Sequence, residues 1–503
     1  MKHSVFALVT LFVSFLFFAG VLIYFLPNDF WQDEVYTLSH FVFVSTATTA
    51  TDYYSTNNHV LFSLFCNLLR QILGFKQLSD VLLHPYFLRS VPVIISLAAV
   101  LIFYKKTANR YGKEAAIICS SVWLSTFPLL CFASQFRGYS LSILLVTLQY
   151  FSFSKIVKSE RITFFRCLIL FLLSSLSLLC LPTNIYIEAS YLLLCLMLFV
   201  IPSFSTILFD TSITKINLIK IISAIAAGCL WTSLYYRWML MQQPQNEFIT
   251  TFHPFAVENL TQSLSIFYRF SGYRLYLPLF LILPIILFIK RMVKKEFSYT
   301  PVLLPFLLFF IPFVFFFIHG AIIIQRTFLS LIPFFCLMTG LALQSFSGIR
   351  FYKPMYNLIM LLNLVCIIIT FVLFVNVSKK NNIVENHQQD LVQHYYLVHF
   401  NALQTTQLAK KMTAKNGYPL YLDDGFGQTG IDYYLSAFQI PFTRISDSTV
   451  LPDHCLILTN LKKKTTGELI DKERNYHQWM QPNEQYNLFE SDGMKGKRIL
   501  QSL

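Results

Sequence analysis

Two adjacent carboxylates, Asp33 and Glu34, follow the first hydrophobic run of the chain. Trp31 and Tyr36 flank them, and such aromatic side chains anchor a segment at a membrane–water interface. A carboxylate that is partly withdrawn from water at this depth can act as a general base. An Asp-Glu pair by itself also fits a solvated loop start. The other polar groups of the chain are therefore needed to distinguish a catalytic pair from a solvated loop.

Four more positions could act together with this pair. Asn58 and His59 end a polar cluster just before hydrophobic sequence resumes, Arg137 lies in Gln135-Phe-Arg-Gly-Tyr139, and Arg326 begins a later apolar run. The guanidinium fork of an arginine matches a lipid-linked phosphate or diphosphate. The alternatives are an arginine that reaches the lipid headgroups from the end of a span and a histidine with a structural role. Weaker candidates for phosphate binding are Arg237, Arg269 and Arg274.

The composition identifies the surroundings of these residues as a membrane. Hydrophobic residues make up 55% of the 503 residues, charged residues make up 13%, and the mean hydropathy is +0.57. Soluble domains carry about a quarter charged residues. The apolar runs are continuous and reach the roughly 20 residues that a transmembrane helix needs, which favours helices over a barrel. The net charge of +14 then reflects basic cytoplasmic loops and not nucleic-acid binding.

The hydrophobic pattern predicts eleven transmembrane helices. The expected spans are 4–27, 86–104, 114–134, 139–155, 165–182, 185–202, 217–236, 275–290, 301–318, 327–346 and 356–377. We interpret the first as an uncleaved span, because it is long for a signal peptide and no cleavage site precedes Pro27. Residues 60–73 are too short to span and are amphipathic, which predicts an interfacial helix.

Basic residues fix the predicted orientation. They concentrate in alternate loops, on the same side as the N-terminus: Lys105, Lys106, Arg110, Lys113, Lys155, Lys158, Arg161, Arg166, Lys215, Lys220, Lys290, Arg291, Lys294, Lys295, Arg350 and Lys353. The positive-inside rule therefore places the N-terminus in the cytoplasm. The loops at 28–80, 135–139, 182–184, 237–274 and 319–326 then face outward, and so does the tail after the eleventh span.

That tail, residues 378–503, has a different composition. Charged and amide residues return, and the apolar runs shorten. Residues 419–423 and 454–459 are typical of short buried strands, and 385–412 and 428–438 are typical of helices. We expect two domains: a transmembrane domain, 1–377, that includes the outer loop 28–80, and a small extracytoplasmic α/β domain, 378–503. No Cys/His spacing typical of a zinc site occurs, and the ten cysteines fit buried apolar positions.

The order of these motifs resembles the GT-C glycosyltransferases of the protein O-mannosyltransferase and aminoarabinose transferase type, including the bacterial RgtA/B/C/D-like group. An acidic pair opens the first outer loop, and Asn58-His59-Val60-Leu61 is similar to a His-Pro-Pro-Leu element. Phe136-Arg137-Gly138-Tyr139 is similar to an Ala-Arg-x-Tyr turn, and Arg326 to Pro333 is similar to an Arg-Tyr-x5-Pro span. The prolines after His59 and the tyrosine after Arg326 are absent. The second loop acid is either Asp52 or Asp80.

The resemblance implies an inverting transfer of a sugar from a polyprenyl-phosphate donor to a lipid, glycan or protein acceptor of the cell envelope, at the outer face of the inner or plasma membrane. Asp33 would be the base, and Glu34 would assist it. The two could share a divalent cation, Mg²⁺ or Mn²⁺, and no other cofactor is implied. Asn58, His59, Arg137, Tyr139 and Arg326 would bind the lipid phosphate and the acceptor.

Two other functions share part of this pattern. A transporter or flippase of lipid-linked sugars would show repeats and charged groups in the middle of its spans. Here the predicted spans hold one acidic residue, Glu188, apart from those at their ends. A polysaccharide polymerase or ligase would use the same donor lipid but gives no reason for the Asp33-Glu34 pair. The pattern favours the transferase.

Overall fold

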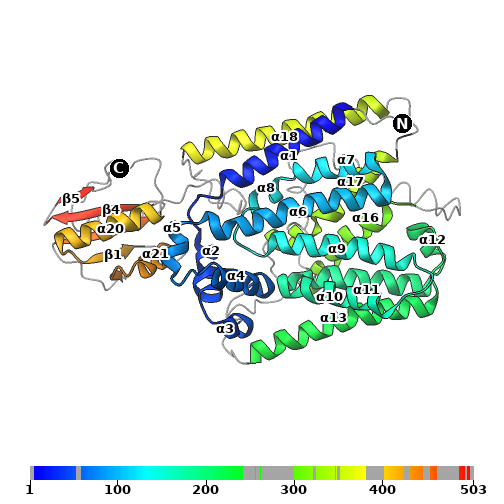
Figure 1. The fold of residues 1–503 in the computed structure, drawn as a ribbon, viewed down its shortest axis with the longest axis horizontal. Coiled ribbons are helices and arrows are strands. Elements are labelled where there is room, and N and C mark those ends of the chain that lie inside the picture. Colours follow the sequence, from blue (N-terminus) through cyan, green and yellow to red (C-terminus); the bar gives the residue numbers. More distant parts are fainter. Residues whose placement is uncertain are drawn as a thin grey trace. The chain divides into compact units, whose positions relative to one another are not determined.

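The chain forms two compact units, each built from several stretches of sequence. The computed structural model describes residues 5–52, 58–241, 255, 261, 300–320, 325–345, 347, 352–380, 402–423, 430–445, 454–460, 486–492 and 495–498. The first unit, called the helical unit, comprises residues 1–24, 51–62 and 91–371. The second, called the mixed unit, comprises residues 25–50, 63–90 and 372–503 (Figure 1).

Apolar helices, most of them long, make up the helical unit. They are α1 (Val5–Tyr24), α6 (Tyr86–Tyr111), α7 (Lys113–Leu124), α8 (Phe127–Phe132), α9 (Tyr139–Val157), α10 (Phe164–Cys180), η2 (Pro182–Asn184), α11 (Ile185–Val200), α12 (Phe204–Phe209), α13 (Lys215–Met241), α16 (Leu303–His319), η3 (Gln325–Leu331), α17 (Ile332–Gln344) and α18 (Tyr352–Lys380). The first residues of α6 and the last of α18 belong to the mixed unit.

Six of the described helices are long and apolar enough to cross a bilayer, so the chain is a membrane protein. They comprise α1, α6, α9, residues 182–200, α13 and the first part of α18. The predicted span at 275–290 lies outside the described residues, and the count of eleven stays a prediction. The predicted span at 114–134 is divided into α7 and α8, because Pro128 lacks the N–H that would continue a helix and sits instead in the first turn of α8.

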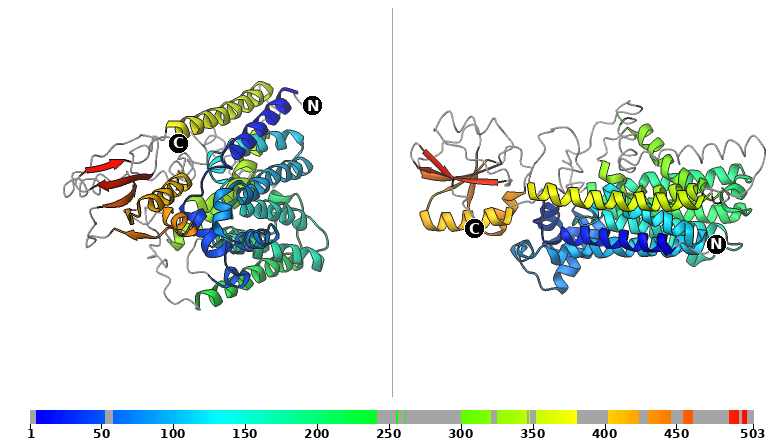
Figure 2. Two further views of the ribbon diagram at one scale, coloured as in Figure 1. Left: turned by 60° about the vertical axis from the view of Figure 1, so that its left-hand side comes forward. Right: turned by 90° about the horizontal axis from the view of Figure 1, so that it is seen from above.

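Close contacts between backbones hold this bundle together, and small residues allow them. In α17, a Cβ atom on Gly340 would lie 2.3 Å from the Cys119 Sγ atom of α7. In α13, a Cβ atom on Gly228 would lie 2.8 Å from the Phe171 carbonyl oxygen of α10. Helices in lipid associate largely by such packing, because apolar surface gains little by leaving lipid. Helices α1 and α18 also lie side by side, with Phe371 against Phe17 (Figures 1 and 2).

The predicted outer loop 28–80 is mostly helical. It contains α2 (Gln32–Thr37), the π-helix η1 (Leu38–Val42), α3 (Thr46–Thr51), the whole of α4 (Val60–Ile72) and the start of α5 (Leu78–Leu83). Helix α4 matches the amphipathic helix that the sequence predicts. The shorter helices are stabilised by tertiary contacts: Asn67 Nδ2 donates to the Val44 carbonyl at 3.0 Å and to Thr49 Oγ1 at 2.7 Å.

A five-stranded sheet forms the C-terminal part of the mixed unit. This part of the chain comprises α20 (Ala402–Asn416), β1 (Leu420–Asp423), α21 (Ile431–Ala437), β2 (Phe442–Arg444), β3 (His454–Asn460), β4 (Tyr486–Asp492) and β5 (Lys495–Arg498). The strand order is β2-β1-β3-β4-β5, with β1 parallel to β2 and β3 and the other pairs antiparallel. Leu420 pairs with Phe442 and Leu456, and α20 packs against β4 (Figure 2). Strands β1 and β3 match the two predicted strands.

Candidate active site

Three of the predicted site residues meet inside the helical unit. His59, just before α4, places its Nε2 atom 3.0 Å from Nη2 of Arg137. The His59 ring also packs edge-on against Tyr139, the first residue of α9, with ring centres 5.1 Å apart. The Arg137 guanidinium lies 5.9 Å from the centre of the same tyrosine ring. All three side chains are buried. The structure therefore brings together two motifs that are 78 residues apart in the chain.

The turn between α8 and α9 positions Arg137. Gly138 allows the close approach, because a Cβ atom there would lie 2.6 Å from Nδ1 of His59. Cys180, the last residue of α10, donates its thiol to the Gly138 carbonyl at 3.1 Å. Gln135 in the same turn is 2% exposed, and its amide group makes no hydrogen bond to the described residues. Such an amide costs stability when it is buried alone and marks a place where a polar ligand can bind.

The segment of Arg326 packs against the same end of α9. Arg326 belongs to η3, and its side chain lies outside the described part of the structure. In η3 the Ser330 hydroxyl lies 2.7 Å from the Ser142 hydroxyl of α9. Asn184 of η2 donates to Ser142 at 2.7 Å and to the Ser177 carbonyl at 3.0 Å. These hydrogen bonds join α9, α10, η2 and η3 at the end of the bundle where Arg137 lies.

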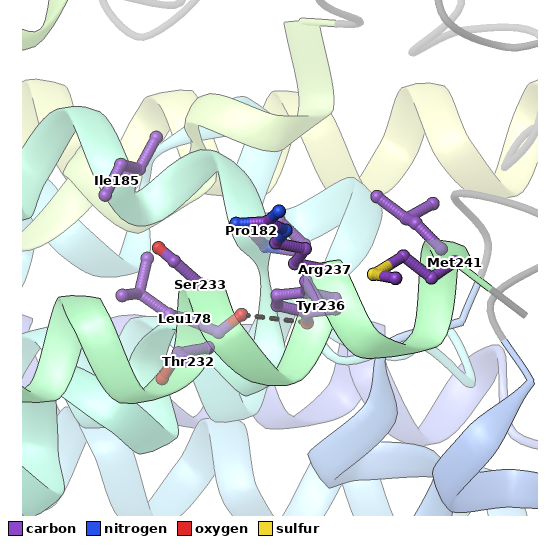
Figure 3. Close-up of a pocket in the computed structure, with 9 residues that line it drawn as sticks. Leu178, Pro182, Ile185, Thr232, Ser233, Tyr236, Arg237 and Met241 are labelled. Carbon is purple, nitrogen blue, oxygen red and sulfur yellow. Dashed lines mark hydrogen bonds between the residues drawn. The ribbon is translucent and has the colours of Figure 1, made fainter.

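A cavity of about 560 Å³ lies beside the C-terminal end of α10 and the N-terminal end of α11 (Figure 3). Its walls are formed by Leu178, Pro182, Ile185, Thr232, Ser233, Tyr236, Arg237, Leu240 and Met241, most of them apolar. The sequence pattern placed Arg237 in an outer loop. The structure instead continues α13 to Met241, so Arg237 is on a helix and lines the cavity. The Tyr236 hydroxyl donates to the Leu178 carbonyl at 3.1 Å, which joins α13 to α10 beside the cavity.

The acidic pair belongs to the mixed unit, where its two members have different surroundings. Glu34 is 1% exposed and forms an ion pair with Arg89, with 2.6 Å between Oε2 and Nη2. The same oxygen accepts the Trp31 backbone N–H at 3.2 Å and so caps α2. Asp33 is only half-buried, in the first turn of α2, where the helix dipole favours a carboxylate. Asp33 is thus the member of the pair that a substrate could reach.

Arg89 is a residue that the sequence analysis missed. Besides Glu34, its guanidinium donates to the carbonyls of Phe25 at 3.1 Å, Asp29 at 3.2 Å and Asn28. It also lies 4.5 Å from the centre of the Phe30 ring. One signal could have found it: Arg89 begins a predicted span on the predicted outer side, against the positive-inside bias, as Arg137 does.

Two further contacts fasten the C-terminal elements to the residues just before α2. The backbone N–H of Phe30 donates to the Tyr434 hydroxyl of α21 at 2.8 Å, and that hydroxyl donates to the Phe30 carbonyl at 3.3 Å. The Asp29 carboxylate accepts the Leu403 N–H in the first turn of α20 at 2.9 Å. Burial raises the pKa of Asp29 to about 6, against the lowering effects of this hydrogen bond and of Arg89.

The surroundings of Glu34 do not fit the divalent cation that the resemblance implied. Its carboxylate is already held by the Arg89 guanidinium, whose positive charge opposes a second cation. Within the described ranges, no group of three or more His, Cys, Asp or Glu side chains could hold a metal ion. We therefore assign Glu34 a positioning role and derive no step through a metal. A role for Asp33 as a metal ligand stays a prediction.

The other candidates have local roles in the structure. Asn58 is buried and donates to the Asp52 carbonyl at 2.7 Å, which holds the chain just before His59. The Asp80 carboxylate accepts the Gln77 N–H at 3.0 Å and caps α5. Arg269 and Arg274 lie outside the described residues.

Comparison with known proteins identifies the fold. No family model matches the chain. No curated protein matches it in sequence either. Among solved structures, the chain is similar to ArnT from Cupriavidus metallidurans bound to undecaprenyl phosphate, with a TM-score of 0.53 at 12% identity over 93% of this chain and 94% of ArnT. The apo state of ArnT gives the same TM-score at 10% identity.

The chain has the GT-C fold. The resemblance that the sequence motifs predicted is thus confirmed at the level of the fold. The Archaeoglobus fulgidus oligosaccharyltransferase, tethered with an acceptor peptide, also aligns, at 11% identity over 89% of this chain and 64% of that one. Its TM-score is 0.47.

Proposed function

We propose that the chain is an inverting membrane glycosyltransferase. It would move a sugar from a polyprenyl-phosphate donor to an acceptor of the cell envelope at the outer face of the membrane. The observation that carries the proposal is the buried contact between His59 and Arg137, in a chain whose fold is that of a transferase crystallised with undecaprenyl phosphate. Arg137 and the amide of Gln135, which makes no hydrogen bond within the described part of the chain, provide donors for a phosphate in the same turn.

The cavity beside Arg237 supports a lipid as the carrier of this phosphate. Its apolar walls suit a prenyl chain, and the Arg237 guanidinium suits an anionic headgroup. Helix α10 links the two places, because Leu178 lines the cavity and Cys180 contacts the Gly138 turn. Arg137 and Arg237 would then offset the charge that grows on the departing lipid phosphate. No nucleotide-sugar site is needed, because the activating phosphate arrives on the lipid.

Asp33 would accept the proton of the acceptor hydroxyl as that oxygen attacks the anomeric carbon from the face opposite the phosphate. The bond from the anomeric carbon to the phosphate oxygen breaks, and polyprenyl phosphate leaves as an anion. Glu34 and Arg89 would not touch the substrate. They would hold α2, and so Asp33, in a fixed position.

The direct test is transfer by the purified full-length chain in nanodiscs. Undecaprenyl phosphate that carries different radiolabelled hexoses and pentoses is offered together with an envelope extract as acceptor. The proposal predicts that label moves to the extract, with release of one undecaprenyl phosphate for each sugar transferred. In sealed liposomes that contain the protein, movement of intact lipid-linked sugar across the bilayer, without release of the carrier, would support a flippase and contradict the proposal.

A further inference from the structure

Three aromatic rings meet in the mixed unit, close in sequence to Asp33. Tyr36 and His40 stack on each other, with ring centres 4.0 Å apart and an angle of 13° between the rings. Tyr433 of α21 stands at 89° to Tyr36 and at 84° to His40, with centres 6.1 and 5.7 Å away. All three side chains are half-buried. We call this right-angled arrangement of Tyr36, His40 and Tyr433 the aromatic corner.

The local backbone makes the stack possible. Tyr36 lies in α2 and His40 in the π-helix η1, whose wider turn is closed by the Phe43 N–H on the Leu38 carbonyl at 2.8 Å. Single π-turns are rare and occur often at functional sites. Nδ1 of His40 lies 2.8 Å from the Ser39 hydroxyl and 3.2 Å from the Tyr36 carbonyl. Its Nε2 atom makes no hydrogen bond to the described residues and can bind a ligand.

The third ring is held firmly in place. Tyr434, the next residue, is fully buried and hydrogen-bonds to both backbone polar groups of Phe30. On the other side of Tyr433, Asp432 forms an ion pair with Arg444 of β2 at 2.6 Å. The aromatic corner therefore joins α2, which carries Asp33, to α21, which follows about 400 residues later in the chain.

The chemistry of the corner suits a sugar ring. One face of a pyranose carries only C–H groups, which pack on the negative face of an aromatic ring, and its edge carries hydroxyls that need polar partners. The corner supplies aromatic surface, a ring nitrogen on His40 and the hydroxyl of Tyr433. Carboxylates also stand close by, since Asp33 precedes Tyr36 by one turn of α2 and Asp432 adjoins Tyr433. A phosphate would find two carboxylates here and is disfavoured.

We propose that the aromatic corner binds a pyranose ring of the glycosyl acceptor. The C-terminal elements would in this way take part in acceptor selection. This inference rests on the proposed glycosyl transfer, since it places the acceptor sugar one helical turn from the proposed base. Tyr36, His40 and Tyr433 are binding residues in this scheme and take no part in proton transfer.

Saturation-transfer NMR on the full-length chain in phosphatidylcholine nanodiscs tests the site without knowledge of the acceptor. The probes are the methyl glycosides of glucose, galactose, mannose and N-acetylglucosamine, with sorbitol as a polyol that has no ring. We expect at least one glycoside to receive saturation, strongest at the C–H protons of one ring face, and sorbitol to receive none. Absence of ring saturation for all four glycosides in the wild type would overturn the inference.

Two variants and a matched control locate the binding. Tyr433→Ala should lower the saturation at least fivefold, whereas Tyr433→Phe keeps the ring and should lower it at most twofold. Tyr418→Ala removes a tyrosine that stacks on His454, with centres 5.5 Å apart, elsewhere in the mixed unit, and should leave the signal unchanged. Equal saturation in wild type and Tyr433→Ala would overturn the inference. Its failure is distinguishable from that of the proposed function, because release of undecaprenyl phosphate is measured separately.

Discussion

The Arg89 guanidinium holds Glu34 in a buried ion pair, with Nη2 and Oε2 2.6 Å apart and both side chains at most 5% exposed. The same guanidinium contacts three backbone carbonyls between Phe25 and Asp29. One side chain thus joins the segment from Phe25 to Asp29, which follows α1, to the helix that carries Asp33. Removing either charge of a buried pair leaves the other uncompensated.

Glu34→Gln should therefore destabilise the protein by about 3–5 kcal/mol, because Arg89 would stay buried without a counter-charge. The measurement is thermal unfolding of the purified protein in detergent. Glu34→Gln combined with Arg89→Met should recover part of the loss. The control is Arg444→Gln, which breaks a pair whose arginine side chain is 48% exposed and should cost at most about 1 kcal/mol. An unchanged unfolding temperature in Glu34→Gln would refute the positioning role.

Gly138→Ala should impair transfer without unfolding the bundle. The new methyl group would meet Nδ1 of His59 at 2.6 Å, so that His59 and its contact with Arg137 must shift. A shift of about 1 Å in a positioned group can cost roughly 10²-fold in rate. The assay is release of undecaprenyl phosphate per folded protein. Gly20→Ala, a helical position with no atom within 4 Å of the added Cβ, is the control and should stay active. Full activity in Gly138→Ala would show that this geometry is not required.

The stability of the mixed unit depends on pH through Asp29. Its pKa rises from 3.8 to about 6 on folding, so the folded state binds the proton more tightly than the unfolded state. The stabilisation from this group is complete below about pH 3.8 and is lost as the pH rises to about 6. Asp29→Asn keeps an acceptor for the Leu403 N–H but cannot ionise. It should raise the unfolding temperature at pH 7.5 and flatten the change between pH 4 and 6.

Asp80→Asn is the matched control for this charge change. Asp80 caps α5 at a half-buried position, where a carboxylate near a helix N-terminus is favourable. Its replacement should lower the unfolding temperature slightly at pH 7.5, opposite in sign to Asp29→Asn. A lower unfolding temperature for Asp29→Asn at pH 7.5 would show that the hydrogen bond and Arg89 outweigh burial.

Arg237→Gln should weaken binding of undecaprenyl phosphate about tenfold, since a hydrogen bond to a charged group contributes about 1.5–3 kcal/mol. The affinity can be measured by native mass spectrometry of the protein in detergent micelles with added lipid. Arg161→Gln, an exposed arginine on the predicted cytoplasmic side, is the control and should bind as the wild type does. Equal affinity of wild type and Arg237→Gln for undecaprenyl phosphate would show that the cavity is not part of the donor site.

The sequence predicts some of these helices and site residues and does not predict others. Hydrophobic run lengths were enough to place α1, α6, α9 and α13, because a helix in lipid must satisfy its backbone internally. Arg137 could be proposed because an arginine in a predicted outer turn opposes the positive-inside bias. Arg89 stands in the same kind of position, but its role depends on where Glu34 folds back to it.

Nothing in the sequence indicates which residues the C-terminal elements contact. Tyr434 and Phe30 are 404 positions apart, and neither belongs to a motif that would pair them. The helices α2 and α3 are too short to show a clear periodicity, and each is stabilised by a side chain from elsewhere in the chain, α2 by Arg89 and α3 by Asn67. For the same reason the sequence predicts the segment 28–80 as a loop. Arg237 is predicted beyond the end of its helix because its charge interrupts the apolar run.

The central claim is that Asp33 acts as the base in transfer of a sugar from a polyprenyl-phosphate donor. The most direct measurement compares the release of undecaprenyl phosphate by wild type and Asp33→Asn in the reconstituted transfer assay. Loss of a general base lowers the rate by about 10²–10⁴-fold. The account predicts a loss of this size, with unchanged membrane insertion and unchanged affinity for undecaprenyl phosphate. Transfer by Asp33→Asn at the wild-type rate would contradict it.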